Sequence, residues 1–353
     1  MSPNFSDNTN MDTIDFKKLS EQLRSELLRV NGWRKVVRTG SIAVYLFVFC
    51  WFMFVLFGGA LVSYIGLENY MQFTQYIIPV FIGFIVVNFV FTRCMTNFQE
   101  RESEAMQHIM STLFPTVYFS ASSQVDSRIL RDSKLFSASF SDPALAANTY
   151  GYIQFPHGEY SLHVADIGVS YGLLNKLQYN PVLGYFVMIY RFVLRPLFAS
   201  RLDSSPHNFR GMFAWCKIDK RFKGNIIILP DHLEQKIGYL AKNIQGLKKR
   251  YSARLLQLED QEFENYFAVY ADDEVEARML LTPAMMRHMT ALRQTFGCDI
   301  MLSFSRGTFY YAAVMPSGFL CVRPSALNDG KLLEDIYNDI SLSCKVAEEL
   351  RLN

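Results

Sequence analysis

The sequence predicts an α+β fold: an N-terminal transmembrane helical hairpin with a helical stalk, then a mainly antiparallel sheet domain with packed helices. Three observations support this prediction. Two long uncharged runs lie within the first hundred of the 353 residues, and segments with helical spacing flank them. From about residue 116, apolar and polar positions alternate between turn residues, which is typical of strands. Half of all residues are hydrophobic, whereas soluble domains are about 45–50% apolar even when glycine is counted.

The two uncharged runs are long enough to predict membrane-spanning helices. The first has 29 residues between Arg38 and Glu68, and the second has 24 residues between Glu68 and Arg93. A helix rises about 1.5 Å per residue and needs roughly 20 apolar residues to cross the hydrocarbon core. We therefore predict two transmembrane helices within residues 41–93, at about 41–64 and 72–92. The short connector between them makes the hairpin antiparallel.

The distribution of basic residues predicts the orientation of this hairpin. Its tip carries Glu68 and no basic residue, and basic residues stay on the cytoplasmic side of a membrane. We therefore expect a multi-pass membrane protein with both termini, and everything after Arg93, in the cytoplasm. The basic residues that flank the two runs are Arg29, Arg34, Lys35, Arg38, Arg93 and Arg101.

Amphipathic segments lie on both sides of the predicted hairpin. Residues 1–12 are polar and are predicted to form a disordered tail. Residues 13–38 repeat apolar side chains at spacings of three and four, which predicts an amphipathic helix. Residues 94–115 follow the same spacing as a stalk helix that Pro115 ends. These two helices either pack on each other as a stalk or form a seam between subunits.

The rest of the chain, residues 116–353, is predicted to be one cytoplasmic α+β domain. A helix is expected over residues 283–297, because Thr282 is a good N-cap and proline follows it. The pair Arg306-Gly307 predicts a tight hairpin turn, and an apolar stripe over residues 332–350 predicts a C-terminal helix. Strands are predicted at Tyr152–Phe155, Tyr160–Val164, Gly211–Lys217, Gly224–Leu229, Tyr266–Tyr270, Ile300–Phe304 and Phe309–Val314.

The amphipathic segment 181–198 has two interpretations. It is strongly apolar, with Arg191 and Arg195 one helical turn apart. As a helix lying in the membrane interface it would turn both arginines toward lipid phosphates, which makes them candidate lipid-facing residues. As a helix packed on the sheet it would leave both arginines in water. Both interpretations remain open.

The sequence offers no recognisable catalytic, cofactor-binding or metal-binding motif. It has no GxxxxGK[ST] phosphate loop, no GxSxG elbow, no HExxH pair and no Rossmann glycine fingerprint. Its six cysteines are scattered, and His157 and His163 have a poor spacing for a metal site. We therefore predict no cofactor and no metal. The net charge of +2 gives no field that would draw nucleic acid.

The densest polar cluster is the candidate functional site of the sequence. It contains Asp272, Asp273, Glu276 and Arg278, between two apolar segments. Paired carboxylates can transfer protons or hold a divalent cation. The cluster lacks the partner residues that such chemistry needs, which favours a structural turn.

Residues 263–283 contain an FE-x-x-F-x-V-Y segment, then an acidic turn, EAR and LTP. This segment resembles the pattern of a bacterial family, the domain of unknown function 3137. Gly211-Met212-Phe213, Phe222-Lys223-Gly224 and the final Leu350-Arg351-Leu352-Asn353 are similar to further elements of the family. The resemblance implies a two-span protein of the bacterial cytoplasmic (inner) membrane with a cytoplasmic domain. It implies no reaction. Residues 168–205 are longer and more apolar than the family pattern.

These observations lead to one expected function and two alternatives. We expect a membrane-anchored, non-enzymatic interaction or regulatory module. The alternatives are a membrane-proximal enzyme that uses the Asp272–Arg278 region, and an oligomeric pore or transporter subunit. The expected partners are the lipid bilayer, anionic lipid head groups, an unidentified protein and further copies of the chain. Nucleic acid is not an expected partner.

Overall fold

The computed structural model describes most of the chain, which divides into two compact units. One unit comprises residues 1–22, 106–175 and 207–353, and the other comprises residues 23–105 and 176–206. Each unit is described by itself below. The described residues are 16–65, 77–115, 117–136, 146–157, 160–170, 177, 180, 183–190, 209–218, 224–230, 254–256, 258–316, 318–320, 333–338 and 340–341.

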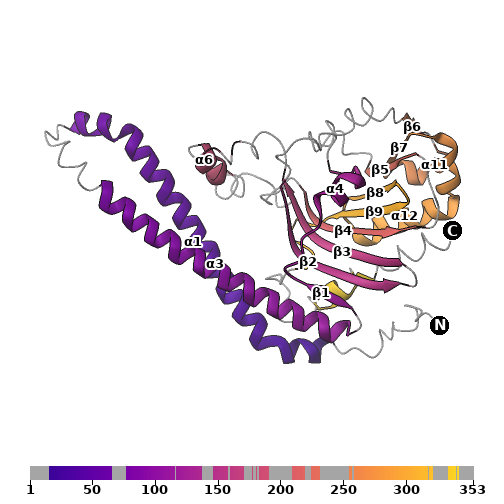
Figure 1. Cartoon of the computed structure of the whole chain (residues 1–353), viewed down its shortest axis with the longest axis horizontal. Helices are drawn as coiled ribbons and strands as arrows, with labels where there is room; N and C mark the ends of the chain where they lie inside the picture. Colours follow the sequence, from indigo (N-terminus) through magenta and orange to yellow (C-terminus); the bar gives the residue numbers. More distant parts are fainter. Residues whose placement is uncertain are drawn as a thin grey trace. The chain divides into compact units, whose positions relative to one another are not determined.

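The larger unit contains a nine-stranded sheet in which all strand pairs are antiparallel (Figure 1). The strand order is β1-β2-β3-β4-β9-β8-β5-β7-β6, so strands distant in sequence become neighbours at the centre. The strands are β1 (Tyr118–Ser120), β2 (Ala146–His157), β3 (Tyr160–Ser170), β4 (Phe209–Lys217), β5 (Ile226–Pro230), β6 (Arg254–Leu256), β7 (Phe267–Ala271), β8 (Ile300–Ser305) and β9 (Thr308–Val314).

Each of the seven predicted strands coincides with an observed one, and the prediction of a mainly antiparallel sheet with helices is confirmed. The Arg306-Gly307 turn between β8 and β9 is also confirmed, since both residues have positive φ, at 53° and 70°. Such values match the primed turns that join twisted strands. β2 is longer than predicted because it continues through an irregularity between Thr149 and Gly151.

Short helices accompany the sheet, and side-chain caps fix where they begin. They are α4 (Ser127–Ser133), α10 (Gln261–Glu264), α11 (Glu274–Leu280) and α12 (Pro283–Phe296). The Thr282 hydroxyl accepts from the backbone N–H of Met285, and Gly297 ends α12 in the left-handed conformation. The predicted helix 283–297 is therefore confirmed. In the predicted C-terminal helix, residues 333–338 and 340–341 are helical, and its other residues lie outside the described part.

The main core lies between one face of the sheet and the segment around α4. Alternating residues of β3 and β4 point into it, and Phe136 packs on Phe209 and Phe213 with ring centroids 4.8 and 5.4 Å apart. Edge-to-face ring pairs of this kind stabilise a core beyond simple burial. The same core contains Ala165, Ile167 and Val169 from β3 and Leu130 and Leu135 from the α4 segment.

The other unit contains most of two long helices, α1 (Phe16–Ile65) and α3 (Ile77–Leu113), which run alongside each other (Figure 1). An ion pair of 2.7 Å joins Arg34 to Glu102, and the guanidinium of Arg101 lies 5.3 Å from the Trp33 ring centroid. Gly40 lies against Phe91, since a Cβ on Gly40 would approach that ring to 3.0 Å. These contacts place the two helices antiparallel.

The predicted transmembrane helices require a correction. Among the helices of the described residues, none combines the length and apolar character needed to span a bilayer. This finding overturns the hairpin predicted at 41–64 and 72–92, and with it the multi-pass protein of the bacterial inner membrane. In α3, the uncharged part covers residues 77–92, before Arg93. At about 1.5 Å per residue this described stretch is ~24 Å long, against a hydrocarbon core of ~30 Å.

The uncharged run in α1 requires the same correction. Helix α1 is uncharged from Thr39 to its end at Ile65, and no stretch of its described residues qualifies as a membrane span. The connector residues 66–76 lie outside the described part. Within the segment 181–198, α6 (Leu183–Ile189) is helical, and Arg191 and Arg195 also lie outside the described residues.

Candidate functional site

The acidic residues that the sequence singles out lie where β7 leads into α11. Asp272 accepts two hydrogen bonds from Asn225, from its backbone N–H at 3.0 Å and from its side-chain amide at 2.5 Å. Asp273 is the N-cap of α11, because its Oδ1 accepts from the backbone N–H groups of Val275 and Glu276 at 2.8 and 3.2 Å. Both carboxylates therefore satisfy backbone donors that a helix start and a strand start leave open.

The two remaining candidate residues, Glu276 and Arg278, lie on α11. Glu276 Oε2 accepts from the backbone N–H of Gly224 at 3.0 Å, so Asp272 and Glu276 together hold residues 224–225. Arg278 pairs with Glu274 one turn earlier on α11 at 3.0 Å, an exposed pair of small energetic value. The structure thus brings Asp272 and Glu276 onto the start of β5, whereas Asp273 and Arg278 serve α11 itself.

Arg278 also lines a cavity of about 620 Å³ beside α11. The residues that precede α10 form one part of its wall, including Leu258, Glu259 and Asp260. Leu281 and Met286, from the junction of α11 with α12, form another part. The cavity therefore lies against the same segment that carries the family resemblance.

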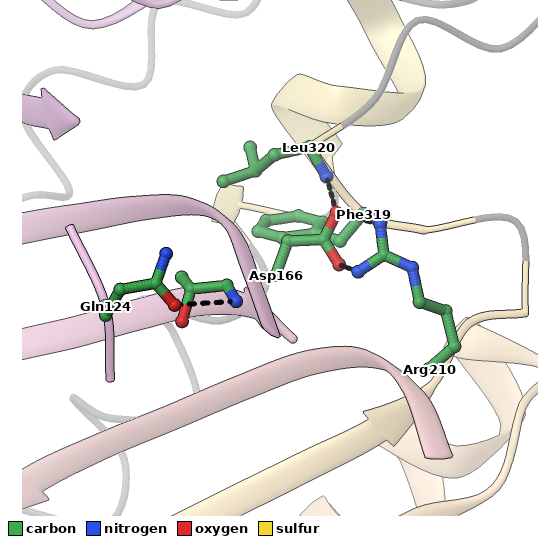
Figure 2. Close-up of polar contacts among 6 residues, drawn as sticks. Gln124, Asp166, Arg210, Phe319 and Leu320 are labelled. Atoms are coloured by element: carbon green, nitrogen blue, oxygen red, sulfur yellow. Dashed lines mark hydrogen bonds and ion pairs between the residues drawn. The ribbon is translucent and has the colours of Figure 1, made fainter. Parts of the chain in front are cut away.

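A second polar cluster, unpredicted from the sequence, is centred on Asp166 in β3 (Figure 2). Asp166 is fully buried, and its two oxygens accept from the two terminal nitrogens of Arg210 at 2.5 and 2.9 Å. Its Oδ2 also accepts from the backbone N–H groups of Phe319 and Leu320 at 3.1 and 3.0 Å. One carboxylate therefore ties the segment 318–320 to strands β3 and β4.

Both partners of this ion pair are largely buried, with Arg210 10% exposed and Asp166 not exposed. Burial raises the pKa of the Asp166 carboxyl above its ordinary value, while Arg210 and the two backbone N–H groups offset part of that rise. The Arg210 guanidinium stacks on Tyr150, 3.7 Å from the ring centroid. Nearby, Gln124 Oε1 accepts from the backbone N–H of Thr149 at 3.2 Å, next to the irregularity in β2 (Figure 2).

Sequence reasoning missed Asp166 and Arg210 because they are 44 residues apart and belong to no motif. One signal was present: Asp166 interrupts an apolar strand, between Ala165 and Ile167. A carboxylate at such a position needs a partner, since an unpaired buried charge is very costly. The chain supplies that partner at the start of β4.

Of the two histidines considered for metal binding, His163 packs among aromatic rings. Its ring stacks on Trp215 with centroids 5.0 Å apart, and its Nδ1 lies 2.5 Å from the Tyr152 hydroxyl. Burial lowers the pKa of His163. The side chain of His157 lies outside the described part. Among the described residues, no three His, Cys, Asp or Glu side chains form a group that could hold a metal ion.

The helical pair carries a strip of exposed apolar side chains. The seven side chains are 40–62% exposed, and we call them the apolar strip. Arg93 lies next to the strip, with its guanidinium 5.7 Å from the Phe89 ring centroid. Exposed Lys35 and Arg38 precede the strip along α1. The strip consists of Ile42, Leu46 and Phe47 on α1 and Val86, Val87, Phe89 and Val90 on α3.

The fold and these sites define an α+β protein that combines an antiparallel sheet with a pair of long helices, and whose candidate acidic residues accept hydrogen bonds from the backbone. Residues 207–352 match the family model described as "Protein of unknown function (DUF3137)". This match confirms the resemblance inferred from the sequence, over those residues. It does not extend to the predicted membrane spans.

The other comparisons add little. The search of curated proteins finds no match for the sequence. Among solved structures, the crystal structure of the mycobacterial trehalose monomycolate transport factor A, TtfA, is similar, with a TM-score of 0.33 and 7% sequence identity. The similarity covers 67% of this chain and 94% of that chain. A likeness at that level carries no argument about function.

Proposed function

We propose that this protein is a non-enzymatic interaction module whose helical pair binds a protein partner through the apolar strip. The strip carries the proposal. Monomeric proteins rarely expose large contiguous apolar patches, and those that do commonly bind another molecule there. Each Å² of apolar surface removed from water contributes about 25 cal/mol, so covering several of these side chains would favour association by several kcal/mol.

The charges beside the strip indicate the chemistry of the partner. The exposed charged residues next to it are basic, namely Lys35, Arg38 and Arg93. The sequence has no acidic residue from Glu26 to Glu68, or from Glu68 to Glu100. The complementary partner surface is therefore apolar at its centre and acidic at its rim. Complementary charges of this kind speed association and reject wrong partners more than they add affinity.

The helical pair also supports the proposal by its preorganisation. The Arg34–Glu102 ion pair and the stacking of Arg101 on Trp33 hold α1 and α3 together on one side of the strip. A surface that is already ordered loses less conformational entropy on binding than a flexible one. The structural roles of Asp272, Asp273 and Glu276 support a non-enzymatic role, because each carboxylate accepts a hydrogen bond from the backbone.

Quantitative co-purification of the full chain after chemical crosslinking tests this proposal. The triple variant Leu46→Gln, Val86→Gln and Phe89→Gln should lose a partner that the unaltered chain recovers. Leu28→Gln is the matched control, because Leu28 is an equally exposed apolar residue of α1 outside the strip. Recovery of the same partner by the triple variant would contradict the proposal.

A second arm of the experiment asks whether lipid covers the strip. The purified chain is mixed with vesicles of anionic phosphatidylglycerol, and bound protein is measured by flotation. We expect no flotation that depends on the strip. Flotation that the triple variant abolishes and Leu28→Gln preserves would assign the strip to lipid and overturn the protein partner.

A further inference from the structure

The cavity beside α11 has the dimensions of a binding site. Its volume of about 620 Å³ lies within the range of roughly 300–1,000 Å³ that ligand sites occupy. Leu258 lines it on the side of α10, and Leu281 and Met286 line it from the junction of α11 and α12. All of these residues belong to the sheet-containing unit, so the cavity is independent of the apolar strip.

Two exposed apolar side chains lie on α11, the helix that carries the cavity residue Arg278. Val275 and Met279 are 68% and 73% exposed, and they lie four residues apart on one face of the helix. Arg278, which lines the cavity, is the direct neighbour of Met279. An occupant that uses both surfaces must be extended, as a peptide segment is, with one apolar side chain in the cavity and another on α11.

The charged residues around the cavity indicate whether its occupant is positively or negatively charged. Glu259 and Asp260 line it, and each carries a carboxylate. Among the described residues that line the cavity, Arg278 carries the opposing charge, and it pairs with Glu274 on α11. The acidic residues Glu262 and Glu264 of α10 add to the negative charge of this region. A cationic group is therefore favoured beside the apolar one.

We infer that this cavity binds a peptide segment in which a large apolar residue stands next to lysine or arginine. The apolar side chain occupies the space between Leu258, Leu281 and Met286. The cation lies against Glu259 and the Asp260 oxygen that does not cap α10, since Oδ1 of Asp260 accepts from the backbone N–H of Phe263. A second apolar residue of the peptide contacts Val275 and Met279.

Fluorescence anisotropy with the full-length chain tests this inference. The probe is a labelled nonapeptide of alternating leucine and lysine, and the comparison peptide carries glutamate in place of each lysine. Glu259→Lys should weaken binding of the lysine peptide about tenfold, equivalent to one charge pair reversed in sign. Glu104→Lys is the matched control, because it makes the same charge change at an exposed site of α3 and should leave the affinity unchanged.

Two further variants separate the charge from the apolar contact. Asp260→Asn retains an N-cap for α10 and should weaken binding several-fold, since it removes one carboxylate. The pair Val275→Ser and Met279→Ser replaces exposed side chains only and should weaken binding several-fold. Equal affinity of Glu259→Lys and Glu104→Lys for the lysine peptide would overturn the inference. Tighter binding of the glutamate peptide would also overturn it.

Discussion

Asp166 of β3 and Arg210 of β4 form a buried, bidentate ion pair across neighbouring strands. Arg210 is 10% exposed and Asp166 is not exposed at all. The same carboxylate accepts from the backbone of Phe319 and Leu320, so it joins three parts of the chain that lie far apart in sequence. Leu320 packs tightly there, since a Cβ on Gly151 would approach its side chain to 2.9 Å.

Removing one partner of this pair should be strongly destabilising. Asp166→Ala leaves a buried guanidinium and two backbone N–H groups without their acceptor, and should lower the free energy of unfolding by about 3–5 kcal/mol. Urea unfolding followed by tryptophan fluorescence measures the loss. Arg306→Ala is the control, because the Arg306–Asp132 pair is 75% and 41% exposed, and it should cost less than about 1 kcal/mol. Equal losses for the two variants would refute the structural role of Asp166.

Gly211 at the start of β4 should tolerate no side chain. Its φ is 155°, and a Cβ there would stand 2.1 Å from the Ala313 carbonyl oxygen, on the paired strand β9. Gly211→Ala should therefore destabilise the sheet by several kcal/mol. Gly32→Ala is the control, because nothing lies within 4 Å of a Cβ on helical Gly32. That variant should stabilise by roughly 0.5–1 kcal/mol. Thermal unfolding measures the stability of both variants. A Gly211→Ala variant as stable as the unaltered chain would contradict this prediction.

Because Asp273 caps α11, substitutions of this residue should destabilise the protein to different degrees. Asp273→Ala removes the acceptor of two backbone N–H groups and should cost about 1 kcal/mol of stability. Asp273→Asn keeps a side-chain oxygen that can accept these hydrogen bonds. It should lower the free energy of unfolding by only a few tenths of a kcal/mol. Chemical denaturation of both variants measures the difference. A loss in Asp273→Asn as large as that in Asp273→Ala would show that the carboxylate charge matters more than the cap.

His163 should make stability depend on pH. Burial lowers its pKa in the folded chain, so between that value and the ordinary one near ~6.5 the unfolded chain binds more protons. Its contribution is fully present above the ordinary pKa and is lost as pH falls toward the lowered one. His163→Gln should flatten the dependence of unfolding free energy on pH below about pH 7. A slope in His163→Gln equal to that of the unaltered chain would count against this assignment.

Local patterns predicted the strands and α12 well. The short apolar runs of β8 and β9, their positive-φ turn and the N-cap Thr282 are signals carried by neighbouring residues. β1 and β6 were missed because each has three residues, too few for a period to show. The strand order also escaped prediction, because β5 pairs with β8, some 70 residues later, through contacts that no local pattern encodes.

For the candidate sites too, the sequence predicted the features that neighbouring residues encode and missed those that depend on long-range contacts. The acidic turn at Asp272–Arg278 was found from composition, and the preference for a structural role agrees with the backbone hydrogen bonds that Asp272, Asp273 and Glu276 accept. The Asp166–Arg210 pair was not found, because its partners meet only in the folded sheet. The transmembrane prediction rested on a count of uncharged residues along the chain, and among the described residues no helix meets the requirements of a membrane span.

The central claim is that a protein partner covers the apolar strip, and site-specific photocrosslinking in cells tests it most directly. A benzophenone side chain replaces Phe47 or Phe89 in the strip, or Leu28 as the control position. The account predicts the same discrete protein adduct from both strip positions and no such adduct from Leu28. Strip positions that yield no protein adduct, or the same adducts as Leu28, would contradict it.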